Sequence, residues 1–365
     1  MAVSSKRCAA KVVLVETVAL MAPWRQSHPM LGLYRTSMRP CPPHPAWRLS
    51  RLLLVAWLAS AGAWAMPPAQ ILILHSYTLE YPWTKRQHEG FVQALRAGGG
   101  PDAAISTESL DTKRHPYDSS YARTFADFLR FKYAGYRPAL IYVTDDDALA
   151  FARDHLPALF PDSPVFFSGV NDYGARALLD RARMTGVFEQ KEIAPNLGLL
   201  RQLDAKARGI VLLGDGGGTY HAIEREARRD LARYPEIGAT FIATPEIDAL
   251  LAALRQRQEK YLVLTTLGGL TDASGRLLPL RESIGRIAAL RRFVILSMED
   301  VYQFEGVIGG YVTSGLRQGE SAAGLALAFL RGAPLASLAP IERSPNVYLF
   351  DVRALARHGL RSEEH

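Results

Sequence analysis

The chain has 365 residues, of which 48% are hydrophobic and 22% charged, a globular composition with room for two domains. The formal charge of +7 comes from the first 65 residues, which hold eight of the 43 basic residues and one of the 36 acidic ones. The remainder is charge-balanced and lacks the basic footprint of a nucleic-acid binder, so we expect no nucleic-acid partner. Both cysteines, Cys8 and Cys41, also lie in this leader, which leaves the remainder without disulfide or thiolate chemistry.

Residues 47–65 have the pattern of a secretory signal peptide. Two arginines precede a short apolar run, which ends in small residues and an A-x-A motif at Ala65. We predict cleavage after Ala65 and a periplasmic mature chain. The alternative is an uncleaved membrane anchor, but the run is shorter than the about 20 residues that span a bilayer. Residues 1–37 show no globular pattern, which favours a translation start at Met38.

Residues 66–188 are predicted to form a first lobe of alternating strands and helices. Ile71–Leu74 is an unbroken apolar run, typical of a strand buried on both faces of a parallel sheet. Thr84 is a plausible N-cap for the helix that follows this strand. Further strands of this lobe are expected at 105–110, 139–143, 165–167 and 186–189, and helices at 85–97, 117–133 and 148–159.

Residues 189–305 repeat the same winding and predict a second lobe. Its expected strands are 210–213, 239–242, 261–264 and 293–296, and its expected helices are 195–207, 220–233, 246–259 and 280–290. Residues 306–365 are predicted to be a return crossing and a C-terminal segment that packs on the lobes. Repeated strand–helix winding implies two parallel sheets with helices on both faces, an α/β doubly wound class.

Several segments of this chain resemble a bacterial protein family. A strand ends in His-Ser-Tyr at residues 75–77, Trp83 then precedes a helix, and a Gly-Gly-Tyr segment ends at Tyr311. These segments are similar to the substrate-binding-protein-like sensor domains related to the type I periplasmic binding proteins. That family includes solute receptors of ABC transporters and the outer halves of membrane histidine kinases and diguanylate cyclases. The resemblance spans about residues 70–360.

The resemblance implies a two-lobed binding protein with a hinge. The lobes would be joined by crossings near residue 189 and near 300–312, and would close around a small-molecule ligand by hinge bending. We predict the substrate-binding component of an ABC-type transporter, with a membrane permease as partner and no cofactor or covalent chemistry. One alternative is a sensing domain of a two-component or cyclic-di-GMP system, with a sensor-kinase partner, whose membrane and output parts are missing. A second alternative is a secreted hydrolase that uses the same cleft.

The candidate ligand-binding residues lie at or just beyond the ends of predicted strands, where open parallel sheets bind ligands. They are Ser76, Tyr77, Trp83, Asp145, Ser168, Asn171, Glu189, Asp215, Thr266, Glu299 and Tyr311. Tyr77 and Trp83 could form an aromatic wall or simply pack on the first helix. Ser168 to Asn171 could hold a carboxylate or carbonyl group, or be an ordinary turn.

One acidic segment and one glycine-rich segment could be specific binding motifs. Asp145–Asp147 could bind a ligand amine or cap the next helix, while no His or Cys cluster has the spacing of a metal site. The Gly214–Thr219 turn lacks the Gly-Lys-Ser/Thr of a phosphate loop and the last glycine of a dinucleotide fingerprint. We expect a ligand-facing turn with Asp215 as its contact. No G-x-S-x-G elbow supports a serine hydrolase, although a catalytic triad could still assemble in space.

Overall fold

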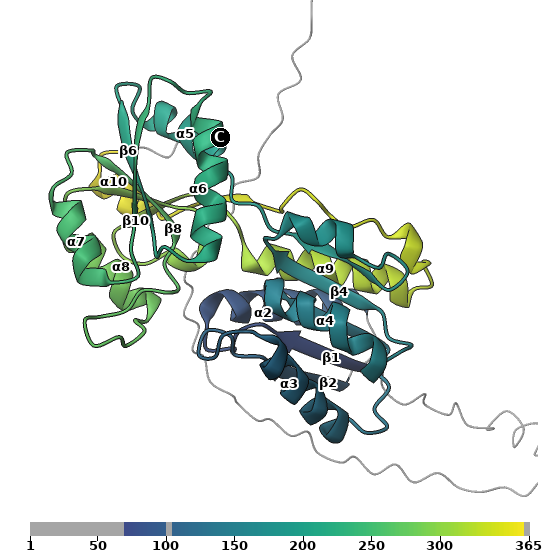
Figure 1. Ribbon diagram of the computed structural model, residues 1–365. Helices are drawn as coiled ribbons and strands as arrows, with labels where there is room; N and C mark the ends of the chain where they lie inside the picture. Colours follow the sequence, from purple (N-terminus) through teal and green to yellow (C-terminus); the bar gives the residue numbers. More distant parts are fainter. Residues whose placement is uncertain (1–68, 100–103, 361–365) are drawn as a thin grey trace, which may run out of the picture. The chain divides into compact units, whose positions relative to one another are not determined.

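The computed structural model describes residues 69–99 and 104–360, which belong to one compact unit (Figure 1). The predicted signal peptide, its cleavage site at Ala65 and the start at Met38 lie outside the described residues. No helix in the described part of the chain is long and apolar enough to cross a membrane.

The first sheet has five parallel strands in the order β2-β1-β3-β4-β5. These strands are β1 Gln70–His75, β2 Ala104–Ser109, β3 Leu140–Thr144, β4 Val165–Val170 and β5 Met184–Phe188. The helices and 3-10 turns around it are α2 Pro82–Ala97, α3 Ser119–Lys132, α4 Asp145–Leu159, η1 Tyr173–Leu178 and, from later in the chain, α9 Gly315–Leu330 and η3 Leu335–Ser337. Ile71 and Ile73 pack with α2 and α9, whereas Leu72 and Leu74 pack with α3 and α4. Helices therefore cover both faces of β1, which is why its sequence is apolar without alternation.

The second sheet has six strands in the order β11-β10-β9-β8-β6-β7, all parallel except β11. These strands are β6 Gly209–Gly214, β7 Gly238–Ala243, β8 Tyr261–Thr266, β9 Val294–Ser297, β10 Val307–Val312 and β11 Val347–Phe350. Its helices and 3-10 turn are α5 Ile193–Leu203, α6 Gly218–Leu231, α7 Ile247–Arg255, α8 Leu280–Ala288, η2 Asp300–Tyr302 and α10 Val352–Arg357. Leu213 and Leu264 pack with α7 and α8, while Leu212 and Val263 pack with α5 and α10. The predicted class, two doubly wound and mostly parallel sheets, is confirmed.

The described chain passes between the two sheets at three places. The first passage runs from β5 to α5 through residues 189–192, the second from β10 to α9 through Thr313 and Ser314, and the third from η3 to β11. The second passage therefore comes after residues 307–312, because β10 is itself a strand of the second sheet, paired with β9. Helix α9 then packs against α2, at positions where Gly90 and Gly319 leave room for the facing backbone.

Helices α2 and α4 each begin three residues earlier than the sequence suggests. Helix α2 starts at Pro82 with Tyr81 as its N-cap residue, since the fixed φ of proline suits the first helical position. The expected N-cap Thr84 is therefore inside the helix and buried, and Trp83 belongs to the first helical turn rather than to a loop. Helix α4 starts at Asp145, not at residue 148, so all three aspartates lie in its first turn, where the helix dipole favours carboxylates.

Candidate functional site

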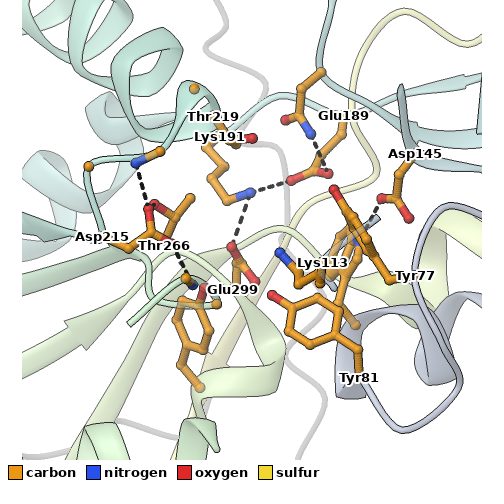
Figure 2. Close-up of a pocket in the computed structure, with 18 of the residues that line it drawn as sticks. Tyr77, Tyr81, Lys113, Asp145, Glu189, Lys191, Asp215, Thr219, Thr266 and Glu299 are labelled. Atoms are coloured by element: carbon orange, nitrogen blue, oxygen red, sulfur yellow. Dashed lines mark hydrogen bonds and ion pairs between the residues drawn. The ribbon is translucent and has the colours of Figure 1, made fainter. Parts of the chain in front are cut away.

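A cavity of about 380 Å³ lies at the carboxyl ends of strands from both sheets (Figure 2). Eight of the eleven residues expected at the site line it. They are Tyr77, Trp83, Asp145, Asn171, Glu189, Asp215, Thr266 and Glu299. The Gly216–Thr219 turn, which was expected to face the ligand, also lines the cavity. Further lining residues, which sequence analysis missed, are Tyr81, Lys113, Lys191, Pro245, Gly268, Gly269 and Tyr302.

The other three expected residues do not line the cavity. The Ser76 hydroxyl donates to the Thr144 carbonyl and accepts from the backbone N–H of Ala148, each at 2.8 Å, so it ties β3 to α4. The Ser168 hydroxyl is buried between Tyr142 and Gln87. The ring of Tyr311 packs on Tyr348 in the neighbouring strand, with a centroid distance of 4.9 Å. All three residues therefore serve the local fold.

An aromatic wall forms one side of the cavity. The rings of Tyr77 and Tyr81 meet edge to face at a centroid distance of 5.6 Å. The ammonium group of Lys113, which comes from the loop after β2, lies 4.4 Å from the Tyr77 centroid and 4.7 Å from the Tyr81 centroid. Both distances are in the range of a cation–π interaction. Neither Tyr81 nor Lys113 follows a strand directly, so the strand-end rule did not select them.

Asp145 is a buried carboxylate held by neutral donors. Its Oδ1 accepts from Trp83 Nε1 at 2.8 Å, and Gln87 Nε2 lies 3.2 Å from each of its oxygens. Burial raises its pKa to about 8, against the lowering effect of the Trp83 hydrogen bond. Its φ of 67° is a left-handed conformation that aspartate adopts more readily than most residues. A side chain at Gly169 would come within 2.8 Å of Asp145 Oδ1, so only glycine fits there.

Lys191 links two further carboxylates across the cavity. Its ammonium contacts Glu189 and lies 3.2 Å from Glu299, as the dashed lines in Figure 2 show. Burial alone would lower the pKa of Lys191, but the two carboxylates raise it above its usual value. Burial also raises the pKa of Glu299 to about 7, although Lys191 opposes the shift. This buried ion triad joins the first passage between the sheets to the end of β9.

The second sheet contributes a turn shaped by Asp215. Its carboxylate accepts from the N–H groups of Gly217 and Gly269, at 3.0 and 2.9 Å, and from the Thr266 hydroxyl at 3.1 Å. These bonds order the glycine-rich turn between β6 and α6. Thr219, in the first helical turn of α6, then faces the cavity.

The site offers hydrogen-bond, ion-pair and aromatic contacts. Among the described residues, no group of three or more His, Cys, Asp or Glu side chains could hold a metal ion. Such a set of contacts is suited to reversible binding of a small polar molecule.

No protein-family model and no curated protein matches the chain. Solved structures do. One is a conserved domain protein from Vibrio cholerae, at 14% identity and a TM-score of 0.58 over 82% of this chain and 97% of that chain. A second is an ABC domain in complex with L-Trp from Streptococcus pneumonia, at 15% identity and a TM-score of 0.57 over 80% of this chain and 95% of that chain. A third is an open, ligand-free substrate-binding protein with adhesive properties from Clostridium difficile, at 15% identity and a TM-score of 0.58 over 81% of this chain and 97% of that chain.

This chain has the type I periplasmic-binding-protein fold. The resemblance seen in the sequence is thus confirmed at the level of the fold. A putative LacI transcriptional regulator from Bacteroides fragilis also matches, at 13% identity and a TM-score of 0.55 over 80% of this chain and 99% of that chain. Since transport receptors and regulators share the periplasmic-binding-protein fold, function has to be argued from the site itself.

Proposed function

We propose that this protein is an extracytoplasmic receptor that binds a small molecule in the cavity between its two sheets. The observation that carries the proposal is the composition of the cavity wall. The first sheet contributes Tyr77 and Asp145, and the second contributes Thr219 and Glu299, although these pairs lie far apart in sequence. A ligand of ordinary metabolite size fits a cavity of about 380 Å³ and would touch both sets of residues.

Binding would be coupled to closure through the segments that join the sheets. Glu189 and Lys191 lie in the first passage, and Glu299 forms an isolated backbone bridge with Thr313 in the second passage. A ligand that contacts these side chains touches the segments in which a hinge has to bend. Binding would therefore favour one hinge angle over others.

The transport role is the finer part of the proposal. The predicted signal peptide supports a receptor that delivers its ligand to a membrane permease. The likeness to the substrate-binding protein from Clostridium difficile and to the ABC domain in complex with L-Trp supports the same role. The regulator with the same fold supports sensing as the second candidate. A neighbouring gene pair for a permease and an ATPase would favour transport, and a kinase or cyclase gene would favour sensing.

The test begins with protein purified from the periplasm. Mass spectrometry of small molecules released on denaturation identifies the ligand, which should raise the melting temperature by mass action and reduce the radius of gyration in solution scattering. Tyr77→Leu in the first sheet and Thr219→Ala in the second should each weaken both responses. Tyr311→Leu is the matched control, because Tyr311 lies outside the cavity. If only one sheet's variant matters, binding across the two sheets is wrong.

A further inference from the structure

We propose that the ligand is a small organic cation, and that its ammonium group replaces that of Lys113 against Tyr77 and Tyr81, in the cavity that Asp145 also lines. This inference rests on the proposed function and adds the chemical class of the ligand. Three features of the cavity carry it: the balance of charge, the aromatic wall and the position of Lys113.

Carboxylates outnumber cations around the cavity. Its charged lining residues are Asp145, Glu189, Asp215 and Glu299, with Lys113 and Lys191. Lys191 is shared between two of the carboxylates. Among the described residues, Asp145 makes no ion pair, and its hydrogen bonds come from neutral Trp83 and Gln87. A carboxyl group buried without a cation holds a proton more tightly than usual, and an ammonium group placed beside it would stabilise the ionised form and release that proton.

The aromatic wall already holds an ammonium group. Lys113 Nζ lies over both tyrosine rings at 4.4 and 4.7 Å, and Lys191 Nζ lies 5.7 Å from the Trp83 ring. Figure 2 shows Lys113 beside Tyr77 and Tyr81. The faces of these rings attract cations through their quadrupoles, most strongly when water is excluded. The chemistry that suits Lys113 at this position also suits the ammonium group of a ligand.

Lys113 is placed so that it can leave. It is an exposed residue in the loop after β2, and it makes no ion pair within the described part of the chain. It also lines a second cavity of about 540 Å³, which shares Tyr77, Tyr81 and Gly268 with the first. Movement of this one flexible side chain would free the tyrosine pair and join the two spaces, leaving room for the rest of the cation.

An anionic ligand is the opposing interpretation, in which the ammonium of Lys113 pairs with a carboxylate of the ligand. The excess of acidic residues argues against it, because an anion would add negative charge near Glu189, Asp215 and Glu299 and would oppose ionisation of Asp145. The two interpretations predict opposite changes in affinity when Lys113 is replaced by methionine. A cationic ligand should bind more tightly, because Lys113 no longer competes for the tyrosine rings, whereas an anionic ligand should bind more weakly, because it loses its partner.

The test uses two sets of probes, and within each set the terminal group is an ammonium, a hydroxyl or a carboxylate. Tyramine, 2-(4-hydroxyphenyl)ethanol and 3-(4-hydroxyphenyl)propionate share one ring, and n-butylamine, n-butanol and butyrate form the aliphatic set. Calorimetry on the full chain should show that at least one amine binds tenfold or more tightly than its neutral and anionic counterparts. Fluorescence gives a second readout, because Trp83 is the only tryptophan after residue 64 and Trp83→Phe supplies the background.

Variants then locate the ammonium group. Asp145→Asn should weaken amine binding at least tenfold, and Lys113→Met should strengthen it several-fold. Lys85→Met is the control for loss of a positive charge, because the Lys85 side chain is 63% exposed, outside the cavity, and paired with Glu89. The proposal is overturned if no amine exceeds its counterparts, or if Lys113→Met weakens amine binding. The proposed function would survive either result, because it fails only when no released ligand depends on both sheets.

Discussion

Carboxylates in two regions of the molecule have opposite environments. On the outside of the second sheet, Asp272 accepts hydrogen bonds from Ser274 and Arg276, which lower its pKa to about 2. In the cavity, burial raises the pKa of Asp145 to about 8 and that of Glu299 to about 7. The carboxylate of Asp272 is partly solvated and paired with Arg276. The cavity carboxylates are desolvated, and Glu299 pairs with Lys191 while Asp145 has only neutral hydrogen-bond donors.

This difference shows that the cavity carboxylates lower the stability of the folded state. A desolvated carboxylate opposes folding unless a partner compensates it, and the partners of Asp145 within the chain are neutral. Strained or undercompensated groups collect at functional sites, where a ligand completes them. The cavity is therefore distinguished from the surface by its electrostatics as well as by its shape.

The largest effect should come from breaking the buried ion triad. Lys191→Met leaves Glu189 and Glu299 buried without their shared cation and should lower the free energy of unfolding by about 3–5 kcal/mol. Urea denaturation at neutral pH measures this loss. The surface control Lys85→Met should cost only about 0.3–0.5 kcal/mol. Adding Glu299→Gln to Lys191→Met should restore part of the stability, and the absence of any restoration would contradict a charge-based origin.

The sequence was informative where a pattern is local. The apolar run Ile71–Leu74 predicts a central strand, and the strand-end rule selects Asp145 and Glu299, which line the cavity. The same rule does not say which way a side chain turns, so it also selected Ser76, whose hydroxyl turns back to the start of α4. Lys191 has no local pattern, because its partner Glu299 is brought near it only by the packing of distant segments.

A smaller effect is expected from removing the indole donor to Asp145. Trp83→Phe keeps an aromatic ring but loses the 2.8 Å hydrogen bond, and should cost about 1–3 kcal/mol because a buried acceptor loses its best partner. In the Asp145→Asn background the same change should cost less, and the double-mutant cycle gives the coupling energy. Additive losses would show that the bond contributes nothing beyond packing. Trp83→Ala is the poorer test, since Trp83 is 4% exposed and packs with Val301 and Tyr302.

The pH dependence of stability should distinguish the cavity from the surface. Because the folded-state pKa of Asp145 is raised to about 8, the folded chain binds a proton that the unfolded chain releases near pH 4. Stability should therefore fall as pH rises from about 5 to 8, by at most about 1.4 kcal/mol per pH unit for this group. Asp145→Asn should flatten the slope. Smaller contributions should remain from Asp146 and Glu299, because burial raises the pKa values of these two groups as well. An unchanged slope in calorimetric melts would show that Asp145 is not the group responsible.

The smallest effect is expected at the surface carboxylate, and its sign is opposite. Because the pKa of Asp272 is lowered to about 2, its contribution is fully present above the unfolded pKa and is lost as pH falls through about 4 to 2. Asp272→Asn should therefore leave the slope between about pH 5 and 8 unchanged, since Asp272 is ionised in both states there. Any difference in melting temperature from the wild-type protein should be small at neutral pH and vanish towards pH 2. The opposite result would be a slope of stability against pH, between about pH 5 and 8, that changes in Asp272→Asn but not in Asp145→Asn. It would show that the carboxylate with the raised pKa lies on the surface instead of in the cavity.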